Sequence, residues 1–176
     1  MIAAAPGVRL VEGPDWLAAV GESWWAAEQT LKRIAPRFAV SGHADSGRIA
    51  QALDQALLMG DANRIAEVGD PDAWLNDKFE HTGLYTIVPA LHGGLETASA
   101  TARFENGRLE LWVASQAPQA CREAVARALD LSLGDVTLFP MPAGGSFDAR
   151  LESDHAVEAA MIARAIGKPV QLTWSR

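Results

Sequence analysis

The tetrapeptide Glu105-Asn106-Gly107-Arg108 is the sequence feature that most constrains the fold. Asparagine and glycine readily adopt the positive φ angles that a two-residue hairpin turn requires. Apolar, strand-like segments flank the tetrapeptide at Thr97–Phe104 and Leu109–Val113. The sequence therefore predicts an antiparallel pair of strands joined by a tight turn at this point.

Helices are predicted where apolar residues recur three or four positions apart behind a capping residue or a proline. The segment that begins at Pro118 has its predicted apolar face at Ala120, Ala124, Val125, Ala128 and Leu129. The other predicted helices are Trp24–Ile34 behind Ser23, a segment from Asp45 or Ser46 to Gly60, and a segment from Ser153 or Asp154 to Gly167.

Strands are predicted from short apolar or alternating runs bounded by turn residues. Strands and helices mix without a regular strand-helix-strand repeat, so the predicted fold class is α+β. The predicted strands outside the hairpin are Val8–Val11, Trp16–Val20, Phe38–Val40, Arg64–Val68, Lys78–Val88, Asp135–Phe139 and Val170–Trp174.

Composition excludes several classes of function. The net charge is −7 and no basic cluster occurs, which argues against a nucleic-acid partner. Cys121 is the single cysteine, so an intrachain disulfide and a cysteine-ligated iron–sulfur site are both excluded. No apolar run reaches the ~18 residues of a membrane span, and the first residues lack the features of a signal peptide. The sequence therefore does not identify the cellular compartment.

The histidines give no metal-binding pattern. His92 and Glu96 are four residues apart, but the intervening Gly93-Gly94 pair disfavours the helix that would give this spacing a meaning. A packing or supporting role is the better interpretation for both. His43, His81 and His155 show no ligand spacing and are expected on the surface or at the end of a segment. No nucleophile elbow supports serine hydrolysis.

Two stretches in the first two thirds of the chain suggest a family. Val20–Leu31 reads as a strand followed by a helix. Leu91–Glu96, Ala100–Ala102 and Glu110–Gln119 follow in order. The second set is similar to the His-Ala-Pro-Leu-Glu-Pro, Ala-Thr-Ala and Trp-x-x-x-Gln-x-Pro series of molybdenum hydroxylase large subunits. The first stretch resembles the hammerhead domain of the same family.

A third stretch, residues 144–176, completes the resemblance. Residues 144–150 resemble the Gly-Gly-Gly-Phe-Gly-Arg-Arg loop of the family, and Asp154 and Gly167–Arg176 resemble its downstream helix and Lys-Pro-Val strand. The three stretches together cover most of the chain. The match is greatest with the isoquinoline 1-oxidoreductase β-subunit group of the xanthine dehydrogenase and aldehyde oxidase superfamily.

The resemblance implies a set of cofactor-facing residues. In the family, a glutamine at the position of Gln116 donates a hydrogen bond to the oxo group of molybdenum. Glycines in the loop let backbone amides approach an anionic ligand closely. Each candidate also has an ordinary structural interpretation. The loop is then a simple turn, Phe147 a core residue, Arg150 a solvated surface residue, and Gln116 a surface or capping residue. The cofactor-facing candidates are Gln116, Gly144, Gly145, Ser146, Phe147, Asp148 and Arg150.

The loop departs from the family at three positions. Ser146 stands in place of a third glycine, Asp148 in place of another glycine, and Ala149 in place of the first arginine. The Asp148 carboxylate would be repelled by an anionic pterin phosphate in a low-dielectric pocket. Either the loop is shifted or cofactor binding is weakened or lost. Arg150 could offset the charge by pairing with Asp148 or by donating to a phosphate.

The resemblance also implies the activity and the partners. It implies a part of a molybdopterin-dependent enzyme that hydroxylates aldehydes or N-heterocycles with water as the oxygen source. Electrons would leave through iron–sulfur clusters in a small partner subunit to an electron acceptor. The general-base glutamate is expected beyond residue 176, so the chain holds no catalytic residue. Alone, it is expected to be inactive and to bind no cofactor.

Two regions are expected from the same resemblance. Residues 1–75 would form a hammerhead-like α+β region that is incomplete at its start, and residues 76–176 the first part of a molybdopterin-binding domain. Unfinished sheet edges could lead the chain to self-associate. The alternative function is a noncatalytic assembly or ligand-binding module that keeps the fold and has lost the cofactor.

Overall fold

The computed structural model describes residues 6–42, 45–59, 63, 65–74 and 80–175. The chain divides into two compact units. The first combines Met1–Arg37 with Ala90–Arg176, and the second is Phe38–Pro89. The domain boundary expected near residue 75 stays a prediction.

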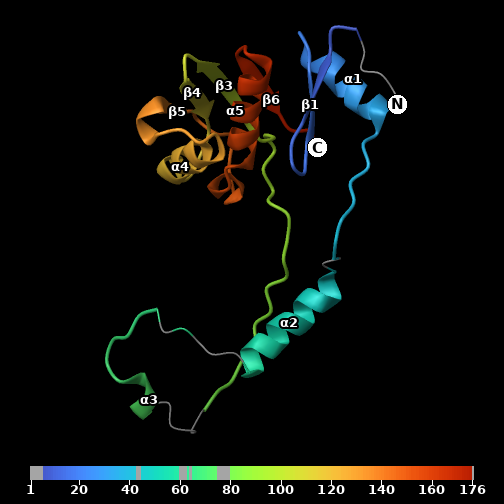
Figure 1. The fold of residues 1–176 in the computed structure, drawn as a ribbon. Helices are drawn as coiled ribbons and strands as arrows, with labels where there is room; N and C mark the ends of the chain where they lie inside the picture. Colours follow the sequence, from blue (N-terminus) through green and yellow to red (C-terminus); the bar gives the residue numbers. More distant parts are fainter. Residues whose placement is uncertain (1–5, 43–44, 60–62, 64, 75–79, 176) are drawn as a thin grey trace. The chain divides into compact units, whose positions relative to one another are not determined.

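The first unit begins with a two-stranded hairpin and a helix (Figure 1). Strands β1 (Arg9–Glu12) and β2 (Leu17–Val20) pair antiparallel, as their apolar runs predict. Helix α1 (Trp24–Ile34) begins where the Ser23 side chain accepts a hydrogen bond from the Ala26 N–H at 3.3 Å. It ends at Ala35, which is left-handed with φ 46°. Pro36 cannot continue the helix, so the chain leaves it there.

A four-stranded mixed sheet forms the body of the first unit. Strands β3 (Ser99–Glu105), β4 (Arg108–Val113), β5 (Val136–Pro140) and β6 (Val170–Thr173) lie in the order β5-β4-β3-β6. Strand β3 is antiparallel to β4 and β6, while β4 and β5 are parallel. Asn106 and Gly107 have φ angles of 49° and 78° in the turn. The hairpin prediction is therefore confirmed.

Two helices cover this sheet and bury its core. Helix α4 (Pro118–Ala128) packs on β5 and on helix α5 (Asp154–Ile166), which packs on β3 and β6. Small residues on α5 let its backbone approach the strands closely. The core comprises Ala100, Ala102, Leu109, Leu111, Val113, Cys121, Val125, Ala126, Leu129, Val136, Ala156, Ala159, Ala160 and Ala163. Short 3-10 helices η1 (Leu133–Asp135) and η2 (Ala149–Leu151) complete the connections.

The described residues of the second unit include two helices. In α2 (Ser46–Met59), the Asp45 carboxylate accepts the Arg48 N–H at 2.9 Å, which confirms that the helix is capped here. In α3 (Pro71–Trp74), Asp70 accepts the Ala73 N–H at 3.1 Å. The apolar stripe of α2, which includes Leu53 and Leu57, is exposed.

Three predicted strands are wrong. Phe38–Val40, Ile65–Val68 and residues 80–88 have no strand conformation. Positions 64, 78 and 79 of these predictions lie outside the described residues. An apolar run becomes a strand only where a neighbouring strand satisfies its backbone groups, and these runs have no ladder partner among the described residues.

Helices and strands are mixed in the first unit without a repeating parallel unit, which confirms the α+β class. Within the described ranges, none of the helices combines the length and the apolar character that crossing a membrane requires.

Candidate cofactor-binding loop

The segment 144–148 lies in the connection between β5 and the 3-10 helix η2 and has an unusual backbone. Gly145, Phe147 and Asp148 have φ angles of 92°, 48° and 66°. Left-handed conformations cost a residue with a β-carbon energy unless the surroundings hold them in place. The loop is therefore held by contacts with other parts of the chain.

Glu96 and Arg150 supply those contacts, and we call the pair the Glu96–Arg150 clamp. One guanidinium nitrogen of Arg150, Nη1, donates to the Gly145 carbonyl and to Ser146 Oγ at 3.3 Å. The other, Nη2, lies 3.5 Å from Glu96 Oε1. The second carboxylate oxygen of Glu96 accepts the Gly144 N–H. The clamp thus binds the loop through both a carbonyl and an amide.

Arg150 is only 5% exposed, so its interpretation as a solvated surface residue is wrong. A guanidinium can be buried where carbonyl, hydroxyl and carboxylate oxygens satisfy its donors. A pair with Asp148, one of the two ways in which Arg150 could offset the Asp148 charge, is not found among the described residues. Asp148 instead accepts a hydrogen bond from the side-chain amide of Gln116 at 3.1 Å.

Gln116 is fixed to the loop through its backbone. It follows β4 and precedes α4, and its N–H donates to the Arg150 carbonyl at 2.9 Å. Ser115 Oγ approaches the same carbonyl at 3.4 Å and accepts the Ala117 N–H at 3.1 Å. The fold thereby brings Gln116 beside a loop that is distant in sequence. The side chains of Gln116 and Asp148 both face solvent.

Phe147 is 66% exposed, which contradicts its interpretation as a core residue. The ring nitrogen Nδ1 of His92 lies 2.5 Å from the Phe147 carbonyl oxygen, a contact that needs the proton on Nδ1. His92 and Glu96 therefore both contact the loop. Among the described residues, no group of three or more side chains is arranged to ligate a metal ion.

His155 is 3% exposed, so the surface position, one of its two expected places, is wrong; it lies instead at the end of a segment, in the first turn of α5. Burial lowers its pKa, the positive charge of Arg150 lowers it further, and Asp154 raises it. Its ring stands edge-on to Trp174 at a centroid distance of 5.9 Å, and its Nε2 has no hydrogen-bond partner among the residues that the structure describes. One signal for this burial is visible in the sequence, because His155 lies in a predicted helix next to the alanines that form the core. His81 is exposed as expected, and His43 lies outside the described residues.

The loop backbone fits an anionic group. Within the described part of the chain, the N–H groups of Ser146, Phe147 and Asp148 make no hydrogen bond. Consecutive free amides in left-handed and turn conformations form concave sites for anionic oxygens. The Asp148 side chain does not fit such a group, because its carboxylate brings negative charge and holds the Gln116 amide.

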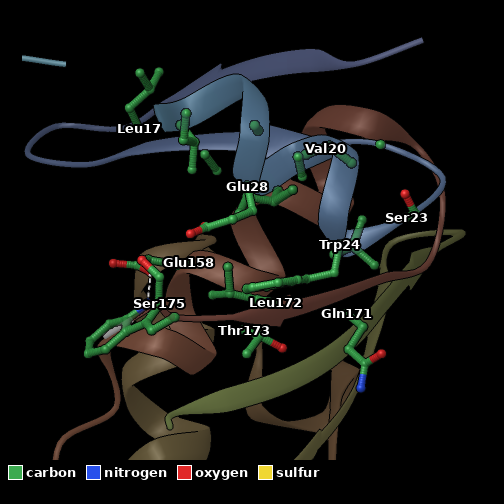
Figure 2. A pocket seen from close by; sticks show the side chains of 18 of the residues that line it. Leu17, Val20, Ser23, Trp24, Glu28, Glu158, Gln171, Leu172, Thr173 and Ser175 are labelled. Carbon is green, nitrogen blue, oxygen red and sulfur yellow. Dashed lines mark hydrogen bonds between the residues drawn. The ribbon is translucent and has the colours of Figure 1, made fainter. Parts of the chain in front are cut away.

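A separate groove lies between β2, α1, α5 and β6 (Figure 2). Its volume is about 660 Å³, and Trp24, Leu172 and Glu158 are among its lining residues. Glu158 accepts a hydrogen bond from the Trp174 indole at 2.6 Å. Burial raises the pKa of Glu158, Trp174 opposes this, and the charges of Asp154 and Asp15 raise it further. None of the predicted cofactor-facing residues lines this groove.

A loop that presents consecutive backbone amides can bind an anionic group, such as that of a cofactor. The family described as the molybdopterin cofactor-binding domain matches residues 59–176, which is more than half of the chain. The chain belongs to this family, and the resemblance to molybdenum hydroxylases seen in the sequence is confirmed.

Two relatives of the chain are much longer than the chain itself. Isoquinoline 1-oxidoreductase subunit beta of Brevundimonas diminuta is 28% identical over 97% of this chain and 24% of its own length. The aldehyde oxidoreductase molybdenum-binding subunit PaoC of Escherichia coli is 30% identical over 62% of this chain and 15% of its own length. The chain therefore spans less than a quarter of these relatives.

Quinoline 2-oxidoreductase of Pseudomonas putida 86 has a similar fold. Its structure superposes with a TM-score of 0.56 over 89% of this chain and 21% of its own chain, at 21% sequence identity. This likeness supports the α+β fold of the chain.

Proposed function

We propose that this chain is part of a molybdopterin-dependent oxidoreductase that hydroxylates aldehydes or N-heterocycles with water as the oxygen source. The observation that carries the proposal is the clamped loop, whose free amides at Ser146, Phe147 and Asp148 lie inside the segment that matches the family. The names of the relatives, an isoquinoline oxidoreductase and an aldehyde oxidoreductase, support the two substrate classes.

In this proposal the loop binds and orients the cofactor, which would supply the metal-centred oxidation chemistry. Arg150 is a positioning residue, because its guanidinium is buried against Glu96 and the Gly145 carbonyl. The proposed cofactor-facing set stays as the sequence predicts: Gln116, Gly144, Gly145, Ser146, Phe147, Asp148 and Arg150. The general-base glutamate is proposed to lie beyond residue 176.

The remaining parts of the proposal follow from the same family. Residues 1–75 are proposed as a hammerhead-like region and residues 76–176 as the first part of the molybdopterin-binding domain. A small iron–sulfur subunit and an electron acceptor are the proposed partners. The isolated chain is proposed to be inactive and to retain no cofactor, because other segments would complete the site.

A noncatalytic assembly or ligand-binding module is the second candidate. The contact between Gln116 and Asp148 favours it, since the amide expected to face the cofactor is already bound to a carboxylate. In such a module the fold would persist without the metal.

The test is the molybdenum and pterin content of the complete subunit, purified with its iron–sulfur partner. Stoichiometric metal in the natural protein would support the oxidoreductase. A folded subunit that holds no metal would support the noncatalytic module. The Asp148→Gly variant shows whether the carboxylate prevents loading, and Asp130→Gly is its matched control because Asp130 is also exposed and left-handed, with φ 53°.

A further inference from the structure

The hydrogen bond between Gln116 and Asp148 joins two exposed side chains that are each fixed at the backbone. The Gln116 N–H is bound to the Arg150 carbonyl, and the Asp148 carbonyl accepts the Leu151 N–H at 3.1 Å. Their side chains meet at 3.1 Å on the loop that presents the free amides. The Asp148 carboxylate therefore lies on the loop whose backbone amides, with the Gln116 side-chain amide, are the donors available to an anionic ligand.

No positive charge neutralises this carboxylate in the described part of the chain. The nearby guanidinium of Arg150 is buried and directed to Gly145, Ser146 and Glu96. The partner of Asp148 is the neutral amide of Gln116. An anionic ligand at the loop would therefore find the Gln116 amide already bound and would be repelled by the negative charge of Asp148.

We propose that Asp148 is an internal competitor for the anion site, and that an anionic ligand binds only as the Asp148 side chain leaves the Gln116 amide. This inference rests on the proposed function, because it takes the loop as the site of a phosphorylated cofactor. Asp148 would then set the affinity of the loop without contacting the reacting atoms.

Two substitutions separate occupation of the donor from simple charge repulsion. Asp148→Asn removes the charge but keeps an oxygen that can accept from Gln116. Asp148→Gly removes both, and glycine adopts the left-handed φ of 66° without strain. Competition predicts a larger effect for glycine than for asparagine, whereas repulsion predicts equal effects.

The experiment is a titration of the 176-residue protein with inorganic phosphate, followed by NMR at the amides of residues 146–148 and the Gln116 side chain. Asp148→Gly is expected to raise phosphate affinity about three- to tenfold and Asp148→Asn less. In a Gln116→Ala background the two variants are expected to bind phosphate equally. Without phosphate, Asp148→Gly is expected to shift the Gln116 side-chain amide resonance.

Asp130→Gly is the control, since it removes the same charge from a left-handed aspartate after the far end of α4. Its phosphate affinity is expected to equal that of the natural protein. Equal gains in phosphate affinity in Asp148→Gly and Asp148→Asn, or no gain in either, would contradict competition by Asp148. Such a result would leave the proposed anion site itself intact. Absence of phosphate binding in every variant would overturn the proposed anion site itself, and the inference with it.

Discussion

Glu96 accepts the backbone N–H of Gly144, and the two residues lie so close that a β-carbon on Gly144 would stand 2.6 Å from Glu96 Oε2. Gly144 does not have a positive φ angle. Its place in the loop is therefore explained by space: only glycine lets the carboxylate reach the backbone amide while it also pairs with Arg150.

The substitution Gly144→Ala is expected to push Glu96 away and to weaken the clamp. The expected loss of unfolding free energy is about 1 kcal/mol, because the added carbon meets the movable end of the Glu96 side chain and the main loss is one hydrogen bond to a partly exposed carboxylate. Urea denaturation measures it. Gly134→Ala is the control, because the nearest atom to its added carbon is Ser132 Oγ at 3.7 Å. Equal stabilities of the two variants would contradict the clamp.

A second prediction concerns the burial of Arg150. Arg150→Met removes the donor of the Gly145 carbonyl and the ion-pair partner of Glu96, which keeps the Gly144 N–H and its exposure to solvent, and is expected to cost about 2 kcal/mol. Arg103→Met removes an exposed ion pair with Glu110 and is expected to cost under about 1 kcal/mol. Denaturant melts of both variants give the comparison. A small cost at Arg150 would show that the loop does not depend on its guanidinium.

Local signals in the sequence predicted the local features of the fold. The Asn106-Gly107 pair predicted the hairpin, Ser23 the start of α1, and Gly167, with φ 69°, the end of α5. Each of these features depends on the backbone preference of one or two residues, and this preference can be read from the residue types alone. The cofactor-facing residues came from the family resemblance and stay predictions.

Contacts between distant segments could not be predicted in this way. The Glu96–Arg150 clamp joins residues more than fifty positions apart, and only the fold brings them together. The buried face of α4 was predicted only in part, since Cys121 and Ala126 are buried while Ala120 and Ala128 are exposed. Because alanines occur on all sides of this helix, the sequence pattern does not identify which face is buried, and tertiary packing determines it.

Cys121 gives a third prediction. Burial raises its pKa to about 11, and a hydrogen bond with Ser153 opposes the shift. The thiolate is the reactive form, so the folded protein is expected to react with a thiol reagent at pH 8 at least about a hundredfold slower than the unfolded protein. Absorbance of the released thiol product, with and without urea, measures both rates. Comparable rates would show that the core opens around α4.

The last prediction concerns the pH dependence of stability through His155. Burial and then Arg150 lower its folded pKa, so the unfolded chain binds more protons as the pH falls below the ordinary value near 6.5. The stability from neutral His155 is present above that pH and decreases as the pH falls toward the lowered folded pKa. In His155→Phe, the fall in unfolding free energy between about pH 7 and pH 5 is expected to be smaller. Urea denaturation at each pH measures this difference, and the same change at the exposed His81 is the control. A pH profile of His155→Phe that parallels the natural protein would show that folding does not lower the pKa of His155.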